Sequence, residues 1–168
     1  MNDIDDISGL IAHMADGLET LTRDAGRDNP VLIGIHTGGV WVAEQLHGKL
    51  GISEPLASLD ISFYRDDFTR IGMNPVVKPS KMPFSIDDRH ILLVDDVLHT
   101  GRTIRAAMNE LFDYGRPASI VLAVLVERDG RELPVEANIV GTHVNLQPDE
   151  HIKLSGPDPL KLEIRQTP

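Results

Sequence analysis

The stretch that decides the fold is ILLVDDVLHTGRT, residues 91–103. It begins with Ile91 to Val94, the most strand-like apolar run in the chain. A short apolar run without polar interruption is typical of a strand buried on both faces of a parallel sheet. Asp95 and Asp96 follow directly and are predicted to end the strand. Because ligands of open parallel sheets bind at the carboxyl ends of the strands, both carboxylates are expected to face a ligand.

The residues after the acid pair are predicted to bind an anion. Thr100 and Thr103 offer hydroxyl groups, and Gly101 lets the backbone approach a ligand closely. Successive N–H groups at the start of a helix attract phosphate. Neighbouring acids would repel a bare polyphosphate but suit sugar hydroxyls or a magnesium ion, so the spacing favours a phosphorylated ribose. The alternative is a strand that ends in two solvated aspartates before an ordinary turn.

Outside this stretch, apolar strands alternate with amphipathic helices. Strands are predicted at residues 31–35, 56–64 and 120–126, and helices at residues 4–21, 40–50 and 103–114. This alternation indicates parallel βαβ units and therefore an α/β sheet. Residues 127–168 are predicted to form short strands and turns. Residues 65–88, with three prolines and little periodicity, are predicted to be a flexible loop that serves as a lid.

Bulk composition limits the classes of function. The 168 residues suit one domain, residues 1–168, with one core. A net charge of −10 is unfavourable for general electrostatic binding of nucleic acid, which needs a positive surface. The absence of cysteine excludes disulfides, zinc–cysteine sites and thiol catalysis. No signal-peptide layout and no apolar run near ~18 residues is present, so a soluble cytoplasmic protein without a membrane partner is expected.

The complete stretch 91–103 resembles the motif with which type I phosphoribosyltransferases bind phosphoribosyl pyrophosphate (PRPP). That motif is an apolar strand, two acids, two apolar residues, a variable residue and Thr-Gly-x-Thr. Its form here is similar to that of the PyrR group, which regulates pyrimidine operons and has uracil phosphoribosyltransferase activity. The resemblance covers roughly residues 31–141 and implies a central parallel sheet flanked by helices, with a flexible loop and a small hood region. Further stretches that agree with that group are residues 60–67, 115–117, 122–126 and 131–134.

The resemblance also implies roles for individual residues. Asp95 and Asp96 would hold the ribose hydroxyls of PRPP as catalytic residues, and would reach the Mg²⁺ that PRPP carries, the implied cofactor. Arg65 would be a cation of the lid, the alternative being a solvated surface arginine. Residues 126–134 would form part of the uracil pocket. The other residues implied in substrate binding are Thr37, Gly38 and Gly39 at the pyrophosphate, Val97, Leu98, His99, Thr100, Gly101, Arg102 and Thr103 in the motif that wraps the 5′-phosphate, and Arg128 and Arg131.

By the same resemblance, the expected reaction is uracil plus PRPP giving UMP and pyrophosphate. The expected partners are PRPP, uracil, UMP or UTP, and pyr mRNA, and the expected assembly is a homodimer or a higher homo-oligomer. Two alternatives stay open. One is a regulatory protein that binds PRPP or a nucleotide with little or no catalysis, and the other is a phosphoribosyltransferase for another base.

The sequence departs from the PyrR pattern in the expected pyrophosphate turn and in the main motif. Residues 36–39 read His-Thr-Gly-Gly where Lys-Thr-Arg-Gly is frequent. A glycine N–H thus replaces a cation, unless Gly38 simply serves a tight turn. His99 stands at the variable position of the motif, where it could exchange protons near neutral pH or only contact its surroundings.

A second departure concerns neighbourhoods that contribute to RNA binding in the PyrR group. Residues 129–131 read Asp-Gly-Arg where Gly-His-Arg is common, and residues 141–143 read Gly-Thr-His where Gly-Lys-Asn is usual. Arg128 and Arg131 remain as cations. The alternative for these two arginines is an ion pair with the neighbouring acids Glu127 and Glu132.

Overall fold

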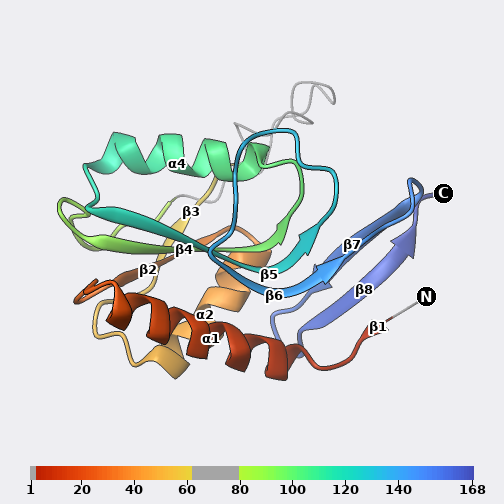
Figure 1. The fold of residues 1–168 in the computed structure, drawn as a ribbon, viewed down its shortest axis with the longest axis horizontal. Helices are drawn as coiled ribbons and strands as arrows, with labels where there is room; N and C mark the ends of the chain where they lie inside the picture. Colours follow the sequence, from red (N-terminus) through yellow and green to blue (C-terminus); the bar gives the residue numbers. More distant parts are fainter. Residues whose placement is uncertain (1–2, 62–79) are drawn as a thin grey trace.

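The computed structural model describes residues 3–61 and 80–168. Its centre is a parallel sheet of five strands in the order β3-β2-β4-β5-β6 (Figure 1). All neighbouring pairs in this sheet are parallel, which confirms the predicted α/β class. The strands are β2 (Val31–Ile35), β3 (Ala57–Leu59), β4 (His90–Leu98), β5 (Ser119–Arg128) and β6 (Ile139–Val144).

Strand β4 lies in the middle of the sheet. Its residues 91–94 pair with residues 31–34 of β2 on one side and with residues 120–123 of β5 on the other. Residues 91–94 and all of β2 are buried. Residues 91–94 and β2 carry no polar side chain, rather than polar side chains at alternate positions, because helices cover both faces of the sheet.

The carboxyl end of β4 differs from the prediction. The strand does not end at Asp95 but continues to Leu98. Among the described pairs, β2 accompanies β4 only as far as Gly34–Val94, whereas β5 stays paired with β4 to Leu98–Glu127. The prediction that the acids end the strand was therefore wrong, because β5 still supplies hydrogen-bond partners there. The acids do lie where the sheet loses β2.

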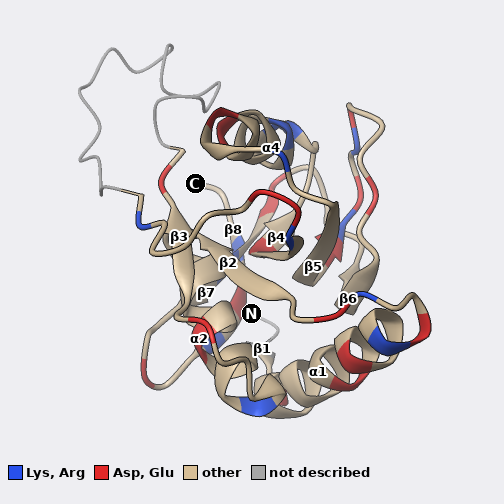
Figure 2. Cartoon of the chain, turned by 90° about the vertical axis from the view of Figure 1, so that its left-hand side faces the viewer, with Lys and Arg blue, Asp and Glu red and all other residues tan. Residues whose placement is uncertain are grey.

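Three helices cover the two faces of the sheet (Figure 2). Helices α1 (Ile7–Asp24) and α2 (Gly38–Leu50) lie on one face, and α4 (Arg102–Tyr114) lies on the other. On α4, Ile104, Ala107 and Leu111 are buried. These residues are three and four positions apart, so they form one stripe that faces the sheet. The three helices predicted from apolar spacing are thus confirmed, with ends shifted by a few residues.

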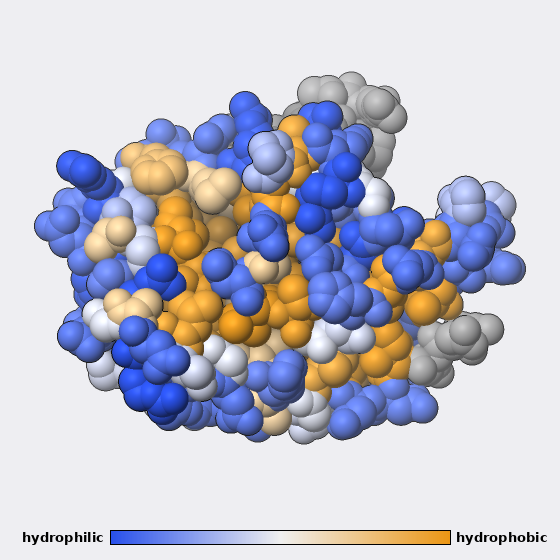
Figure 3. Space-filling view, viewed as in Figure 1, coloured by the Kyte–Doolittle hydropathy of each residue, from blue (hydrophilic) through white to orange (hydrophobic). Residues whose placement is uncertain are grey.

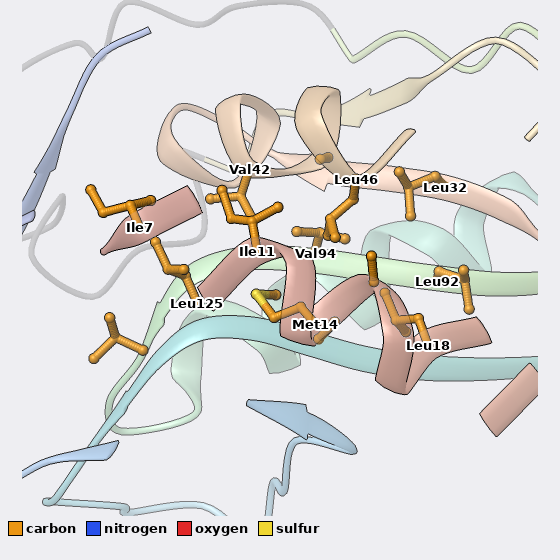
Figure 4. Close-up of a cluster of buried hydrophobic side chains, with 14 of the residues drawn as sticks. Ile7, Ile11, Met14, Leu18, Leu32, Val42, Leu46, Leu92, Val94 and Leu125 are labelled. Carbon is orange, nitrogen blue, oxygen red and sulfur yellow. The ribbon is translucent and has the colours of Figure 1, made fainter. Parts of the chain in front are cut away.

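Each face of the sheet has its own apolar core. The core beneath α1 and α2 brings side chains from both helices against those of the strands (Figure 4). The core beneath α4 is smaller and joins α4 to the opposite side of the same strands. Fully buried members of the first core are Ile11, Met14, Leu18, Leu32, Val42, Ala43, Leu46, Val94, Ala123, Leu125 and Val126.

A second, smaller sheet lies beyond the carboxyl ends of β4 and β5 (Figure 1). It contains β1 (Asp3–Ile4), β8 (Lys161–Gln166) and β7 (Glu150–Ser155), all antiparallel. Leu154 and Leu162 are buried and join the core under α1 and α2. The sheet corresponds to the small hood region that the resemblance implies.

The region between β3 and β4 tests two further predictions only in part. The strand predicted at residues 56–64 is shorter in the structure, because β3 ends at Leu59, and residues 62–64 lie outside the described residues. Of the predicted lid, residues 65–79 also lie outside them. In the described remainder, the amide of Lys81 donates to Ser58 O and the amide of Ser58 to Lys81 O, each at 2.9 Å. This segment is therefore attached to the edge of β3.

The surface is mainly polar, with one apolar area on the face shown in Figure 3. Apolar side chains gather there between α4 and α1, over the edge of the sheet formed by β5 and β6. In this region Ile120, Val135, Ile139 and Val140 are only partly buried. Across residues 3–61 and 80–168, the helices are all too short or too polar to cross a membrane.

Candidate functional site

Asp95 and Asp96 lie on β4 at the point where β2 has ended. Asp95 is only 3% exposed, whereas Asp96 is half-buried. The amide of Asp96 donates to Asp95 Oδ1, and the amide of Val97 donates to Asp96 Oδ1, each at 2.8 Å. Both carboxylates are thus oriented by their own backbone. The more exposed of them, Asp96, is the better placed to meet a ligand.

The turn at Thr37, Gly38 and Gly39 lies directly against this acid pair. Gly38 and Gly39 are buried at the start of α2. A Cβ atom on Gly38 would overlap Asp96 Oδ2, and one on Gly39 would stand 2.7 Å from Val94 O and 3.1 Å from Asp95 Oδ1. Glycine at both positions therefore serves a close approach between the turn and β4. The structure brings the predicted pyrophosphate turn and the predicted sugar acids together.

The third part of the site is the loop that leads from β4 into α4. Gly101 has a φ of +94° and is the N-cap residue of α4, and the structure records no side-chain hydrogen bond to this cap. The amide of Arg102 lies 3.2 Å from Thr100 Oγ1. The first amides of a helix have no partner within the helix, so those after Arg102 can bind an anion. The positive φ explains why glycine stands at position 101.

Residues 127–135 are docked onto this loop. The amides of Glu132 and Leu133 both donate to Thr100 O at 3.0 Å. Arg131 donates from Nε to His99 O at 2.9 Å. The ring of His99 packs against Gly130, since a Cβ atom on Gly130 would stand 2.9 Å from His99 Nε2. The predicted phosphate loop and the segment predicted to hold the base therefore form one structure.

The two arginines of β5 and the following turn have different surroundings. Arg131 pairs with Glu127 at 2.8 Å, as the alternative interpretation predicts. Glu132 instead lies 3.5 Å from Arg102, with both side chains about half exposed. Arg128 Nε is buried and has no hydrogen-bond partner within the described part of the chain. The pairing alternative is thus confirmed for Arg131 with Glu127 only.

The surroundings of His99 shift the pKa of its ring. Burial lowers the pKa of its ring from the ordinary value, and the nearby positive charge of Arg128 lowers it further. Asp129 and Glu132 act in the opposite direction. The ring is therefore neutral at pH 7 and can accept a hydrogen bond from a ligand through one nitrogen.

The structure gathers the described site residues into three adjacent parts: the turn at Thr37–Gly39, the acid pair, and the loop that opens α4. Arg65 lies outside the described residues. Sequence reasoning missed the hydrogen bond from Arg131 to His99 O, which joins residues 32 positions apart and therefore has no local signal in the sequence. Among residues 3–61 and 80–168, no group of three or more acidic, histidine or cysteine side chains could hold a metal by itself.

Comparison with known sequences identifies the family. The description "Phosphoribosyl transferase domain" applies to the family that matches residues 1–153. The Bifunctional protein PyrR of Nitrosococcus oceani is 60% identical over 161 residues, which are 95% of this chain and 91% of that protein. The protein of the same name from Pseudomonas aeruginosa is 55% identical over 154 residues, which are 92% and 91% of the two chains.

Solved structures share the fold at much lower identity. A hypoxanthine phosphoribosyltransferase from Staphylococcus aureus superposes with a TM-score of 0.67 at 21% identity, over 90% of this chain and 79% of that one. The Trypanosoma cruzi hypoxanthine phosphoribosyl transferase gives a TM-score of 0.66 at 22% identity, over 83% and 76%. These likenesses confirm the type I phosphoribosyltransferase fold. With that fold, the acid pair and loop of the motif, and sequence identity over almost the whole chain, the protein belongs to the phosphoribosyltransferase family and, within it, to the PyrR proteins.

Proposed function

We propose that this protein is a bifunctional PyrR: a uracil phosphoribosyltransferase that also regulates the expression of pyrimidine biosynthesis genes. The reaction is uracil plus PRPP giving UMP and pyrophosphate. The observation that carries this proposal is the contact between the glycine turn and the acid pair, beside the open start of α4. Together these parts suit a sugar that carries a phosphate at one end and a pyrophosphate at the other.

Each part of the site takes a different part of PRPP. Asp96, with the buried Asp95 behind it, accepts hydrogen bonds from the ribose hydroxyls. The loop from Thr100 to Thr103 offers amides and two hydroxyls to the 5′-phosphate. The turn at residues 37–39 meets the pyrophosphate through N–H groups. The segment 127–134, against which His99 leans, lines the place of the uracil ring.

Magnesium fits this site as an ion carried by the substrate. Mg²⁺ prefers oxygen ligands and keeps several of its waters, so it is commonly held by phosphates and one or two carboxylates. Asp95 and Asp96 are the carboxylates that would hold it together with PRPP. When bound, Mg²⁺ neutralises charge on the pyrophosphate oxygens.

Catalysis then depends on alignment and charge. The bond between C1′ and the pyrophosphate oxygen breaks, and its electron pair leaves with pyrophosphate. The bond between C1′ and N1 of uracil forms, and the N1 proton passes to solvent. The sugar is cation-like between these events, so the Asp95–Asp96 pair stabilises it electrostatically while the loop and the turn hold both ends of the molecule in line.

The regulatory half of the function concerns pyr mRNA with UMP or UTP as effector. The name of the relatives, Bifunctional protein PyrR, supports two activities in one chain. Their family also supports a cytoplasmic protein that acts as a homodimer or higher homo-oligomer. For a dimer, the partly apolar edge around Ile139 and Val140 is a surface that could be covered.

The test is formation of UMP from uracil and PRPP with Mg²⁺ present. The Asp96→Asn variant should lower kcat/KM by roughly 10²-fold, because the amide removes the charge that stabilises the sugar. Asp16→Asn, an exposed acid on α1, is the matched control and should retain full activity. An unchanged rate in Asp96→Asn would show that the role given to the acid pair is wrong.

Two outcomes would lead to the alternative functions. If guanine, hypoxanthine or another free base replaced uracil in the same assay and gave the faster rate, the protein would be a transferase for that base. If PRPP bound but no base reacted, the protein would be a sensor that binds PRPP without catalysis.

A further inference from the structure

We propose that Arg131 is a positioning residue, which turns the amides of the loop 99–101 toward the 5′-phosphate of PRPP. This inference rests on the proposed binding of PRPP and goes beyond it, because it assigns to Arg131 a role without substrate contact. Arg131 acts through the backbone of His99 and Thr100. Arg131 lies 32 residues after His99 in the sequence, so the two residues come into contact only when the chain folds.

Each of the three nitrogens of the Arg131 guanidinium group donates a hydrogen bond to a different segment of the protein. Its Nε donates to His99 O at 2.9 Å, one terminal nitrogen to Val135 O at 2.9 Å and the other to Glu127 Oε1 at 2.8 Å. All three nitrogens are engaged, so the side chain cannot turn toward a ligand without breaking these bonds. These three bonds within the protein, which we call the Arg131 clip, explain the geometry better than a contact with substrate or RNA does.

The clip determines which way the loop amides point. In a trans peptide, the C=O and the N–H of one peptide plane point in opposite directions. His99 O is held by Arg131, and Thr100 O is held by the amides of Glu132 and Leu133. The N–H groups of the same two planes, those of Thr100 and Gly101, therefore point away from residues 131–133. The proposed 5′-phosphate lies on that side of the loop, next to the start of α4.

Packing makes the orientation rigid. Gly101 is buried, and a Cβ atom on it would stand 3.2 Å from Val135 Cβ and 3.4 Å from Arg131 Cδ. The stem of Arg131 thus supports the loop from behind while its head holds a carbonyl. Without this support the loop would sample other orientations, and part of the binding free energy of the phosphate would be spent on ordering it.

Glu127 holds the clip in place. Its side chain is 18% exposed and accepts from Arg131 through Oε1, while its Oε2 lies 3.0 Å from His143 Nδ1. A charge-assisted hydrogen bond of this kind is stronger than a neutral one. Neutralising Glu127 should therefore loosen Arg131 without removing its bonds to the two carbonyls.

The experiment compares the affinities of PRPP and of inorganic pyrophosphate, each with Mg²⁺, by calorimetric titration of the full chain. Pyrophosphate lacks the sugar 5′-phosphate, so it reports on the rest of the site. In Arg131→Met, which keeps the apolar stem but removes every donor, the Kd of PRPP should rise roughly tenfold, and the Kd of pyrophosphate should not change.

Arg89→Met is the matched control. Arg89 is also a half-buried clip, with nitrogens 3.4 Å from Glu54 Oε1 and 3.2 Å from Asn29 O, but it precedes β4 at the opposite end of the sheet. Its loss should leave both affinities unchanged. If Arg131→Met failed to fold, Glu127→Gln would decide the question, with an expected loss of about threefold for PRPP alone.

Several results would overturn the proposal. These are equal weakening of both ligands in Arg131→Met, the same pattern in Arg89→Met, no change at all, or a wild-type protein that binds PRPP no more tightly than pyrophosphate. A failure of the proposed uracil chemistry is seen separately. In that case the wild-type protein makes no UMP, whereas the PRPP comparison still tests Arg131.

Discussion

Single residues decide how closely the parts of this site approach one another. Gly38 and Gly39 carry no side chain, and the space that a Cβ would take is filled by Asp96 Oδ2 and by the backbone of β4. The glycine at position 38 is therefore coupled to the position of the Asp96 carboxylate. A side chain at 38 and this orientation of Asp96 exclude each other.

Gly38→Ala tests this coupling. The new methyl group should displace the carboxylate of Asp96 and weaken PRPP binding by roughly tenfold, measured as Kd by titration. Gly48→Ala on the same helix is the control, because the added methyl group would have no described atom within 4 Å apart from its chain neighbours and the backbone of its own helix. That variant should bind normally and gain about 0.5–1 kcal/mol in stability. Equal affinities in both variants would contradict the coupling.

His99 provides a second test at this scale. Burial and the charge of Arg128 lower the pKa of its ring, so Arg128→Met should move the pKa of His99 back up toward 6.5, the ordinary value. An NMR titration of the ring protons measures this. Because the unfolded chain takes up the proton first, His99 should cause stability to fall as pH drops below 6.5. A His99 pKa unmoved in the variant would show that Arg128 does not act on it.

At the scale of elements, helix α4 contributes to two regions. Its first turn lies at the proposed site, and Glu110, further along the helix, contacts the chain that follows β3. Further along, Glu110 Oε1 accepts from Ser80 Oγ at 2.9 Å, and Ser80 Oγ accepts from the amide of Asp60 at 2.9 Å. Helix α4 is thus joined to the chain after β3 and before β4. Glu110 Oε2 is buried and has no partner among the described residues.

Glu110→Gln should stabilise the protein at neutral pH. Burial raises the pKa of Glu110, and the negative charges of Asp60 and Asp113 raise it further, against the hydrogen bond from Ser80. The charged form is therefore unfavourable in the folded state, and wild-type stability should increase as pH falls through this raised pKa. Thermal unfolding at pH 7 should show a higher Tm for Glu110→Gln. The difference should shrink at pH 4, and a lower Tm at pH 7 would contradict this account.

At the scale of the whole molecule, the parallel sheet collects the site at one edge. Five strands run in the same direction, so the turns after β2 and β4 and the segment after β5 emerge together. The hood sheet lies beyond that edge (Figure 1). With a net charge of −10, any RNA surface on this molecule must be a local group of cations.

A gel-shift series with pyr leader RNA tests the regulatory function at this scale. Binding should tighten with UMP and weaken as salt rises, with each phosphate contact adding about −0.7 to the slope of log K against log salt. If Arg128 contacts a phosphate, Arg128→Met should reduce the magnitude of this slope by about 0.7. An RNA affinity that does not change when UMP is added would argue against the sensor function.

Much of this protein is determined by local sequence. Apolar runs at residues 31–35 and 91–94 predict buried parallel strands, and a stripe at Ile104 and Leu111 predicts the helix that covers them, because neighbouring residues alone set these periodicities. The motif at residues 91–103 predicts an acid pair beside an anion-binding loop, because strand, turn and helix start are all short-range structures. Resemblance to the PyrR proteins adds the family and its chemistry.

Only the tertiary structure decided how these parts meet. Strand β4 continues beyond Asp95 and Asp96 because β5 remains paired with it as far as Leu98. Residues 95–98 by themselves do not indicate this pairing. Gly38 is required by the carboxylate of Asp96, far along the chain. Arg131 reaches His99 O because the turn after β5 folds back over the loop. Such contacts join segments tens of residues apart, so they depend on the packing of the whole sheet and not on the pattern of any one segment.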